Sequence, residues 1–306
     1  MVRPKRRGRP VHGVILVNKP AGMTSNAVVQ KIRARLRAAK AGHTGALDPL
    51  ATGLLPVCLG EATKFGQVLL NADKGYLATA RLGQKTDTGD ADGEIVETHE
   101  VPEILPQDLA ELEARFSGEI EQIPPMYSAV KHKGTPLHKL ARKGVEVERK
   151  PRSVVIHQLS LSQPRSDQLQ AAVRCSKGTY IRVLMEDIGD ALGCGAHITA
   201  LHRTEVAGLS VDQAVELETL LEDDAPEQYL QAIDTLVQHL PKFNLDAAQK
   251  HSLLHGQPVT ISPRSEAGDV RLYGPGGDFI GVGVIEGTQL KSRRLVSVEY
   301  VQNAKA

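Results

Sequence analysis

Four consecutive apolar residues, Val14–Val17, predict a first β-strand near the start of the chain. Apolar residues then recur three and four positions apart, which predicts a helix from residue 25 to about residue 39. Thr24 or Ser25 would cap this helix and Gly42 would end it. The stretch that follows is polar and rich in glycine, and it fits neither periodicity.

Strand and helix patterns continue without a repeating βαβ rhythm. Helices are expected over Glu61–Leu70, Asp108–Phe116, Ile181–Leu192 (capped by Thr179) and Glu216–Leu240, and strands over Tyr76–Leu82, Glu94–Thr98, Arg152–Leu161, Gln168–Cys175 and Ala196–Val206. The first two of these strands are expected to pair, as are the third and the fourth. The prolines of Ile123–Ala129 favour extended backbone. The mixture predicts an α+β fold with a largely antiparallel sheet.

The composition changes near Pro241, beyond which the chain is rich in Gly and Val. Short strands are expected there over Val270–Tyr273, Phe279–Val284 and Leu295–Val298, with a hairpin turn at Gly274–Asp278. We therefore expect two domains, one over residues 1–240 and a small β-rich one over residues 241–306.

The composition is that of a globular protein with a substantial core. Of 306 residues, 41% are hydrophobic and 24% are charged. No apolar run approaches the roughly 20 residues of a membrane span, and the first ten residues lack the apolar segment of a signal peptide. The three cysteines are scattered, which predicts reduced thiols in a cytoplasmic protein rather than disulfides or a zinc site.

The net charge of +1 hides a separation of charges along the chain. Residues 1–10 carry five basic groups, and residues 131–152 carry eight against two glutamates. Acidic residues gather between Glu216 and Glu227. Each cluster alone could be ordinary solvated surface, but two basic segments with an acidic counterweight favour a nucleic-acid partner.

The run His43–Gly53 combines an imidazole, a carboxylate, a proline and glycines in eleven residues. Such a run predicts a loop of dictated shape, the kind of place where catalytic groups lie. Asp48 precedes a proline, and taken alone an Asp-Pro pair is most often only a turn former.

Several motifs of other enzymes and binding sites are only partly present in this sequence. The tripeptide Asp87–Gly89 matches aspartic proteases, but the second such carboxylate that they need does not occur. A calcium loop from Thr88 would place His99 where a glutamate is needed. The glycines near Gly281 have the wrong spacing for a dinucleotide fingerprint, and no metal-binding His pair or serine nucleophile elbow occurs. We expect neither a cofactor nor a metal.

The segment Gly42–Lys64, which contains the Asp48 run, resembles motif II of the TruB-type tRNA pseudouridine-55 synthases. Other segments resemble further motifs of that family: Gly13–Gly22, Tyr76–Gly93, Gln122–Lys131, Ser176–Arg182 and Gly193–Ile198. The final segment is similar to a PUA domain, a small β-barrel that binds RNA. The resemblance implies a pseudouridine synthase fold, in which helices flank a bent and mainly antiparallel sheet, followed by a PUA barrel.

The resemblance also implies an activity, the isomerisation of uridine to pseudouridine at position 55 in the T loop of tRNA. Asp48 would be the nucleophile, since a carboxylate is ionised at neutral pH without an activating base. Whether it attacks C6, attacks C1′ or removes a C2′ proton stays open. The base must be flipped out of its stack, and aromatic stacking returns roughly 1–3 kcal/mol of that cost.

The remaining site residues are also assigned by the resemblance. The expected roles are ion pairing with Asp48 (Arg182), holding the flipped base (Tyr76 and Tyr180), filling the vacated space (His43), contacting the uracil (Leu201) and binding phosphate (Lys64). The expected partner is the T-arm stem–loop of tRNA, bound by a monomer that needs neither a membrane nor another protein.

Two rival functions remain. A non-catalytic protein that binds or folds tRNA could use the same pocket and tail. A synthase of the same fold could instead act on another RNA uridine. The presence of Asp48, Tyr76, Tyr180 and Arg182 together favours the enzyme.

Overall fold

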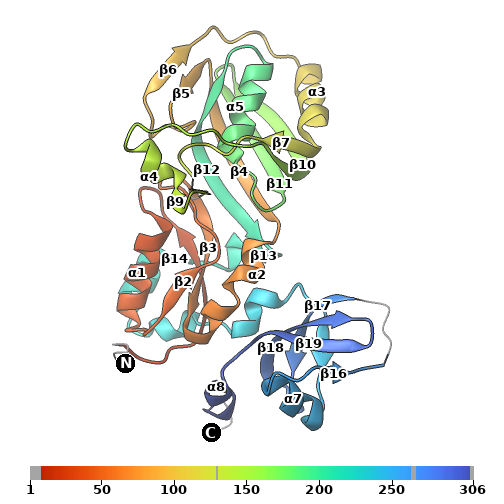
Figure 1. Ribbon diagram of the computed structural model, residues 1–306. Coiled ribbons are helices and arrows are strands. Elements are labelled where there is room, and N and C mark those ends of the chain that lie inside the picture. Colours follow the sequence, from red (N-terminus) through yellow and green to blue (C-terminus); the bar gives the residue numbers. More distant parts are fainter. Residues whose placement is uncertain (1–7, 129, 263–266, 304–306) are drawn as a thin grey trace.

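The computed structural model describes residues 8–128, 130–262 and 267–303. Its largest sheet contains β1 (Gly13–Lys19), β2 (Ala41–His43), β3 (Thr52–Leu59), β4 (Lys74–Leu82), β7 (Gly118–Gln122), β10 (Arg152–Arg165), β11 (Gln168–Cys175), β12 (Ala196–Val206), β13 (Leu209–Ser210) and β14 (Val215–Glu216). The strand order is β14-β1-β3-β12-β4-β11-β10-β7, with β2 attached to β3 and β13 to β12. Only the pairs β1–β14 and β3–β12 are parallel. The α+β class and the mainly antiparallel sheet are therefore confirmed (Figure 1).

Helices and short hairpins surround this sheet. The helices are α1 (Ser25–Arg35), α2 (Gly66–Leu70), α3 (Pro106–Phe116), α4 (Leu137–Ala141), α5 (Ile181–Ala191) and α6 (Leu217–Glu222), with 3-10 turns η1 (Gly60–Lys64), η2 (Val211–Gln213), η3 (Pro226–Tyr229) and η4 (Ile233–Val237). Two small hairpins are β5 (Gln84–Thr86) with β6 (Ile95–Thr98), and β8 (Lys131–His132) with β9 (Thr135–Pro136).

Strand β1 is buried on both faces, as its unbroken apolar run predicts. Ile15 and Val17 belong to a core shared with α1 and α6, whereas Val14 and Leu16 belong to a core shared with η1, α2 and η4. Farther along the sheet, α3 and α5 cover one face of β4, β10, β11 and β12. The opposite face of β4 is open, and Leu77 there is 52% exposed.

The expected pairing of Tyr76–Leu82 with Glu94–Thr98 is wrong. Strand β4 lies between β11 and β12, and Ile95–Thr98 pairs with Gln84–Thr86 instead. The reason is burial: β4 can bury its alternating apolar residues beneath α5, whereas every residue of β6 is exposed. The pairing of β10 with β11 and the bounds of β12 are confirmed.

Four helix predictions need correction. Helix α1 ends at Arg35 rather than near Ala39, because the chain turns through a left-handed conformation at Arg37 (φ 51°). Thr24 caps its start. Glu61–Leu70 is divided between η1 and α2, and Glu216–Leu240 is broken into α6, η3 and η4. Thr179 does not cap α5, since its hydroxyl donates to the Ser176 carbonyl.

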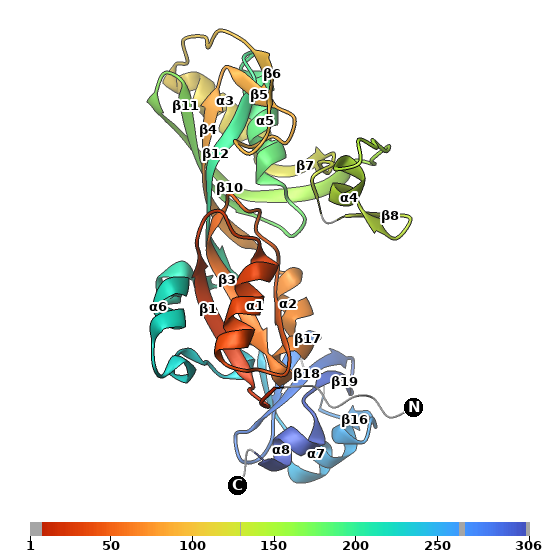
Figure 2. The same cartoon turned by 90° about the vertical axis from the view of Figure 1, so that its left-hand side faces the viewer.

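The C-terminal residues form a separate curled sheet. Its elements are β15 (Lys242–Asn244), α7 (Ala247–Leu254), β16 (Val259–Thr260), β17 (Gly268–Tyr273), β18 (Phe279–Glu286), β19 (Gln289–Leu295) and α8 (Val298–Asn303). The order is β15-β17-β18-β19-β16, a PUA-like half-barrel (Figure 2). The strand expected at Leu295–Val298 is misplaced, because β19 ends at Leu295 and a helix begins at Val298.

The curled sheet packs directly against the base of the large sheet. The Phe65 and Phe279 rings meet edge to face with centroids 5.3 Å apart. The Ser297 amide donates to the Glu61 carboxylate at 2.6 Å. A single apolar core runs from Val14 across this boundary to residues of β17 and β18.

Candidate functional site

Asp48 lies in a loop, residues 44–51, that joins β2 to β3; we call it the Asp48 loop. The Ser25 hydroxyl donates to the Leu47 carbonyl and accepts from the Leu47 amide. The buried Lys19 ammonium donates to the carbonyls of Pro49 and Ala51 at 3.2 and 2.6 Å. These contacts from β1 and α1 dictate the shape of the loop, as predicted, although the last two residues of the run His43–Gly53 belong to β3.

Arg182, in the first turn of α5, holds two carboxylates. Its Nε lies 3.1 Å from Asp48 Oδ2, and its Nη1 lies 3.4 Å from Asp90 Oδ2. The same guanidinium donates to the carbonyls of Thr88 and Tyr127, each at 2.7 Å. Arg182 is only 4% exposed. Because two carboxylates and two carbonyls contact its planar guanidinium, the orientation of that group is fixed. The expected pairing of Arg182 with Asp48 is present in this geometry.

Asp48 is the partly exposed member of this ion pair: its side chain is 43% exposed, whereas that of Arg182 is 5% exposed. Burial raises the pKa of the Asp48 carboxyl, and the Arg182 guanidinium opposes that rise. Asp90 raises it further, and Lys19 lowers it. Burial also lowers the pKa of the Lys19 ammonium to about 8.

Strands β4 and β12 bring Tyr76 and Leu201 beside this loop. Leu201 pairs with Ala78, two residues beyond Tyr76, and its carbonyl faces the Thr52 hydroxyl at 3.5 Å. Asp48 is close enough to Tyr76 for its charge to raise the pKa of the phenol, although burial is the larger cause of that rise. Tyr76 and Leu201 also belong to the same apolar cluster as Leu47 and Ala51, which flank Asp48 in the loop.

Tyr180 and His43 are each held next to an element that carries the site. Tyr180 immediately precedes α5, and its backbone is fixed by Gln122, which accepts from its amide at 3.0 Å. His43 ends β2, and its Nδ1 accepts from the Gly45 amide at 3.3 Å. Burial, followed by the charge of Arg203, lowers the pKa of His43 and so favours a neutral imidazole.

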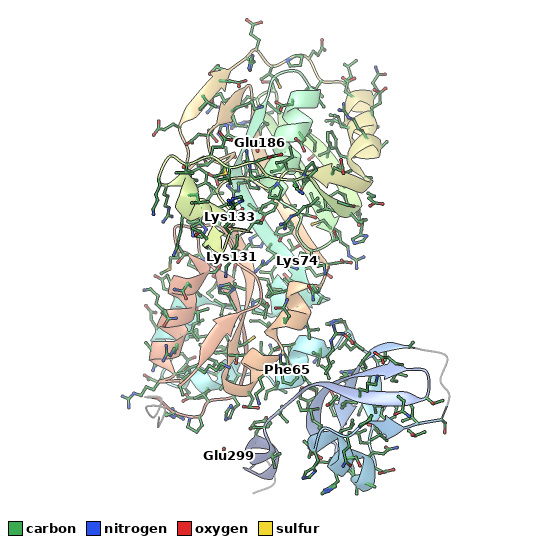
Figure 3. The ribbon with its side chains drawn as sticks, viewed as in Figure 1. Phe65, Lys74, Lys131, Lys133, Glu186 and Glu299 are labelled. Atoms are coloured by element: carbon green, nitrogen blue, oxygen red, sulfur yellow. The ribbon has the colours of Figure 1, made fainter. Side chains whose placement is uncertain are left out.

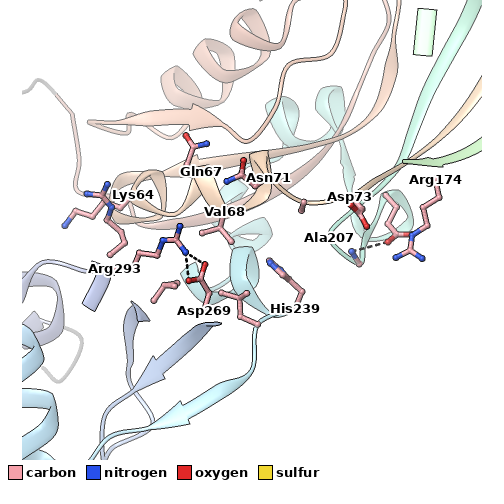
Figure 4. A pocket seen from close by; sticks show the side chains of 16 residues that line it. Lys64, Gln67, Val68, Asn71, Asp73, Arg174, Ala207, His239, Asp269 and Arg293 are labelled. Atoms are coloured by element: carbon pink, nitrogen blue, oxygen red, sulfur yellow. Dashed lines mark hydrogen bonds and ion pairs between the residues drawn. The ribbon is translucent and has the colours of Figure 1, made fainter. Parts of the chain in front are cut away.

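Lys64 is not part of this constellation. It lies at the end of η1, where its ammonium pairs with Glu61 at 2.7 Å. It lines a cavity of about 670 Å³ between the large sheet and the curled sheet, together with Arg174 and Arg293 (Figure 4). If Lys64 binds phosphate, it does so away from Asp48.

Three buried groups at the site were not assigned a role from the sequence. Asp90 is 6% exposed and receives a hydrogen bond from the Thr88 hydroxyl at 2.6 Å. Lys19 and Arg203 are 0% and 1% exposed. Two of these groups could have been found from the sequence, because they lie in segments that resemble the family: Asp90 in Tyr76–Gly93 and Lys19 in Gly13–Gly22.

Within the described residues, no cluster of His, Cys, Asp and Glu has the arrangement of a metal site. Among the same residues, no helix is long and apolar enough to cross a membrane.

Models of known protein families match most of the chain. Residues 33–181 match the N-terminal domain of the TruB family of pseudouridylate synthases, and residues 182–238 match a tRNA pseudouridylate synthase B C-terminal domain. Residues 241–296 match the C-terminal model of pseudouridine synthase II TruB.

Curated relatives agree along nearly the full length. A tRNA pseudouridine synthase B of Haemophilus influenzae is 47% identical over 97% of this chain and 99% of its own. One from Aromatoleum aromaticum is 50% identical over 96% of this chain and 95% of its own. Among solved structures, a chain of a Cbf5-Nop10-Gar1 complex has a TM-score of 0.72 and 25% identity, over 97% of this chain and 89% of that one.

The neighbouring structure confirms the pseudouridine synthase fold that the resemblance implied. With relatives this similar over almost every residue, the chain belongs to the TruB family of pseudouridylate synthases.

Proposed function

We propose that this protein isomerises uridine to pseudouridine at position 55 in the T loop of tRNA. Relatives that are 46–50% identical bear the name tRNA pseudouridine synthase B, which supports tRNA as the substrate. The observation that carries the proposal is the arrangement of Asp48, held by a buried arginine beside two strands that present Tyr76 and Leu201.

In the proposed reaction the uracil leaves its stack and comes to lie beside the exposed side of Asp48. The N1–C1′ bond breaks, the base turns, and a C1′–C5 bond forms. The proton on C5 is lost, and N1 gains one, so the product is an isomer of the substrate. Asp48 acts as nucleophile, and the Arg182 ion pair stabilises its ionised form and fixes its position.

The other expected site residues have supporting positions. Tyr76 and Tyr180 would hold the flipped base, and neutral His43 at the end of β2 would fill the space that the base leaves. Leu201 would contact the uracil from β12.

We propose that residues 1–240 form the catalytic domain and residues 241–306 a domain that helps to bind RNA. The separate family match over residues 241–296 and the separate sheet that starts at Lys242 support this division. We further propose that the protein acts as a monomer in the cytoplasm, without an obligatory protein partner.

A basic arm supplies a surface for the RNA backbone. The arm, residues 130–150, includes β8, β9 and α4 and extends away from the sheet (Figure 2). Its exposed Lys131 and Lys133 lie in front of the middle of the sheet (Figure 3). Just before the arm begins, the Tyr127 carbonyl accepts a hydrogen bond from Arg182 of the site.

Removal of two charges from this arm, in Lys131→Ala with Lys139→Ala, is expected to weaken binding of a T-arm stem–loop. Loss of each phosphate contact should reduce the slope of log affinity against log salt by about 1. Binding measured between low and moderate salt tests this. Arg165→Ala, at the exposed end of β10, is the matched control and should leave the slope unchanged. An unchanged slope in the double variant would exclude the arm from the RNA interface.

The rate should also depend on pH through Asp48. Because burial raises the pKa of this carboxyl, its ionised fraction falls at a pH above the ordinary value of 3.8. The single-turnover rate should therefore decline as the solution is acidified through that raised pKa. A rate that stays constant down to the range of an ordinary aspartate would contradict a reactive, ionised Asp48.

The decisive experiment maps pseudouridine in tRNA from cells lacking the protein. Loss of pseudouridine at position 55 alone supports the proposal. Loss at another uridine would favour the related synthase activity. Normal modification together with tight binding of the T arm would favour the non-catalytic tRNA-binding protein.

A further inference from the structure

Arg203 is a buried cation that the proposed reaction does not yet use. It lies on β12 directly opposite Tyr76 of β4, and it is 1% exposed. Its Nε donates to the Leu54 carbonyl at 2.8 Å, and its Nη2 donates to the Gly45 carbonyl at 3.2 Å. The guanidinium also lies within hydrogen-bonding reach of the Tyr76 hydroxyl.

The partners of Arg203 are unusual for a buried charge. Buried guanidinium groups are costly unless a carboxylate pairs with them. In the described part of the chain, no carboxylate forms an ion pair with Arg203, whereas Arg182 has two. Carbonyl oxygens and a phenol oxygen take that place. A buried charge kept without a carboxylate counter-ion beside the Asp48 loop is a candidate for a functional role.

The two carbonyls bracket the nucleophile. Gly45 lies in the Asp48 loop near its start, and Leu54 follows shortly after its end. Strands β3 and β12 approach each other closely at Gly53, where an added Cβ would lie 2.3 Å from the Arg203 carbonyl oxygen. This close approach lets the Arg203 side chain reach both carbonyls. Arg203 thus connects both ends of the loop to the strand that faces Tyr76.

The charge of Arg203 also acts on two of the expected site residues. It lowers the pKa of His43, in addition to the larger effect of burial. It opposes the rise that burial causes in the pKa of Tyr76. It also contributes, after burial, to lowering the pKa of the half-buried Lys74, which is labelled in Figure 3 and donates to the carbonyl of Ala72 at 2.6 Å.

We propose that Arg203 is a positioning residue that holds the Tyr76 hydroxyl and both ends of the Asp48 loop in register for the reaction. The proposal rests on the proposed function, in which Tyr76 and Asp48 face the flipped uridine. It assigns to β12 a part in catalysis beyond the uracil contact expected of Leu201.

The direct test follows the Tyr76 phenol by NMR in protein labelled with ¹³Cζ-tyrosine. The chain has six tyrosines, and the signal missing in Tyr76→Phe identifies Tyr76. Arg203→Lys keeps the positive charge but loses the planar fork, so the Tyr76 signal should shift. The matched control is His202→Gln on the same strand, which disturbs the contact with the Thr52 hydroxyl (2.8 Å) and should leave the Tyr76 signal in place.

A second, kinetic experiment measures the rate of single-turnover isomerisation and the affinity for the stem–loop. Arg203→Lys should slow the chemical step about 10- to 100-fold, the scale of a misplaced reacting group, with affinity changed less than about threefold. A Tyr76 signal that is unaltered in Arg203→Lys, or that moves equally in His202→Gln, would overturn the proposal. The NMR result stands without any activity, so failure of the proposed function is recognised separately by an absence of isomerisation in the unaltered protein.

If Arg203→Lys does not fold, the reciprocal measurement decides. In protein labelled with ¹⁵N-arginine, Tyr76→Phe should shift a slowly exchanging guanidinium signal from a buried arginine. Arg182→Lys identifies the signal of the other buried arginine at the site, so the two are told apart. No shift in the remaining signal would show that Arg203 does not hold the Tyr76 hydroxyl.

Discussion

Asp48→Asn should retain the fold and the affinity for a T-arm stem–loop but lose at least about 10⁴-fold in turnover, the scale seen when a reacting nucleophile is removed. The fold should persist because Arg182 keeps Asp90 as a counter-ion and Asp48 is itself 43% exposed. The measurement is tritium release from a stem–loop that carries uridine labelled at C5.

The control for this variant is Asp92→Asn, an exposed carboxylate two residues from Asp90. It should release tritium at the normal rate. Normal release by Asp48→Asn would remove Asp48 as the nucleophile, and loss of stem–loop binding would show that the carboxylate has a structural role instead.

The second large effect is expected at Arg182, whose loss leaves two carboxylates without their shared counter-ion. Breaking a buried ion pair in this way costs about 3–5 kcal/mol of unfolding free energy, so Arg182→Met should melt at a clearly lower temperature. Arg182→Lys keeps the charge but cannot reach two carboxylates and two carbonyls, so it should lose activity with a smaller loss of stability.

The pH dependence of Arg182→Met gives a further check. Without the guanidinium, the pKa of the Asp48 carboxyl in the folded state should rise further, because Arg182 is the group that most opposes its rise. The variant should therefore regain stability relative to the unaltered protein as pH falls through that raised pKa. Arg165→Met on the exposed end of β10 should melt normally. Equal losses at pH 5 and pH 8 would argue against a charge effect at Arg182.

The parts of the fold that could be predicted are those whose burial is visible in local pattern. β1, β12 and the β10–β11 hairpin follow from apolar runs and alternation. The neighbours of β4 could not be predicted this way, because they depend on a strand that is more than a hundred residues away. Pattern alone also could not show the breaks in Glu216–Leu240, where packing against the large sheet overrides helix propensity.

In the site, too, local sequence pattern predicts some features, whereas others depend on contacts between distant residues. The loop shape around Asp48 could be predicted because glycine and proline constrain the backbone locally, while the roles of its neighbours came from family resemblance. Asp90 and Arg203 were missed because their meaning depends on contacts across elements: one meets Arg182, and the other meets Tyr76 across β4 and β12. Neither residue type is informative until the strand order is known.

That strand order has a consequence for how the protein is made. β3 and β4 are close in sequence, yet β12 lies between them in the sheet. During synthesis the Asp48 loop and Tyr76 are complete long before Ala196–Val206 leaves the ribosome, so the site cannot be assembled until about two thirds of the chain has been translated. Until then β3 and β4 both have a bare edge, and a nascent chain stalled before Ala196 would be open to pairing with the wrong strand.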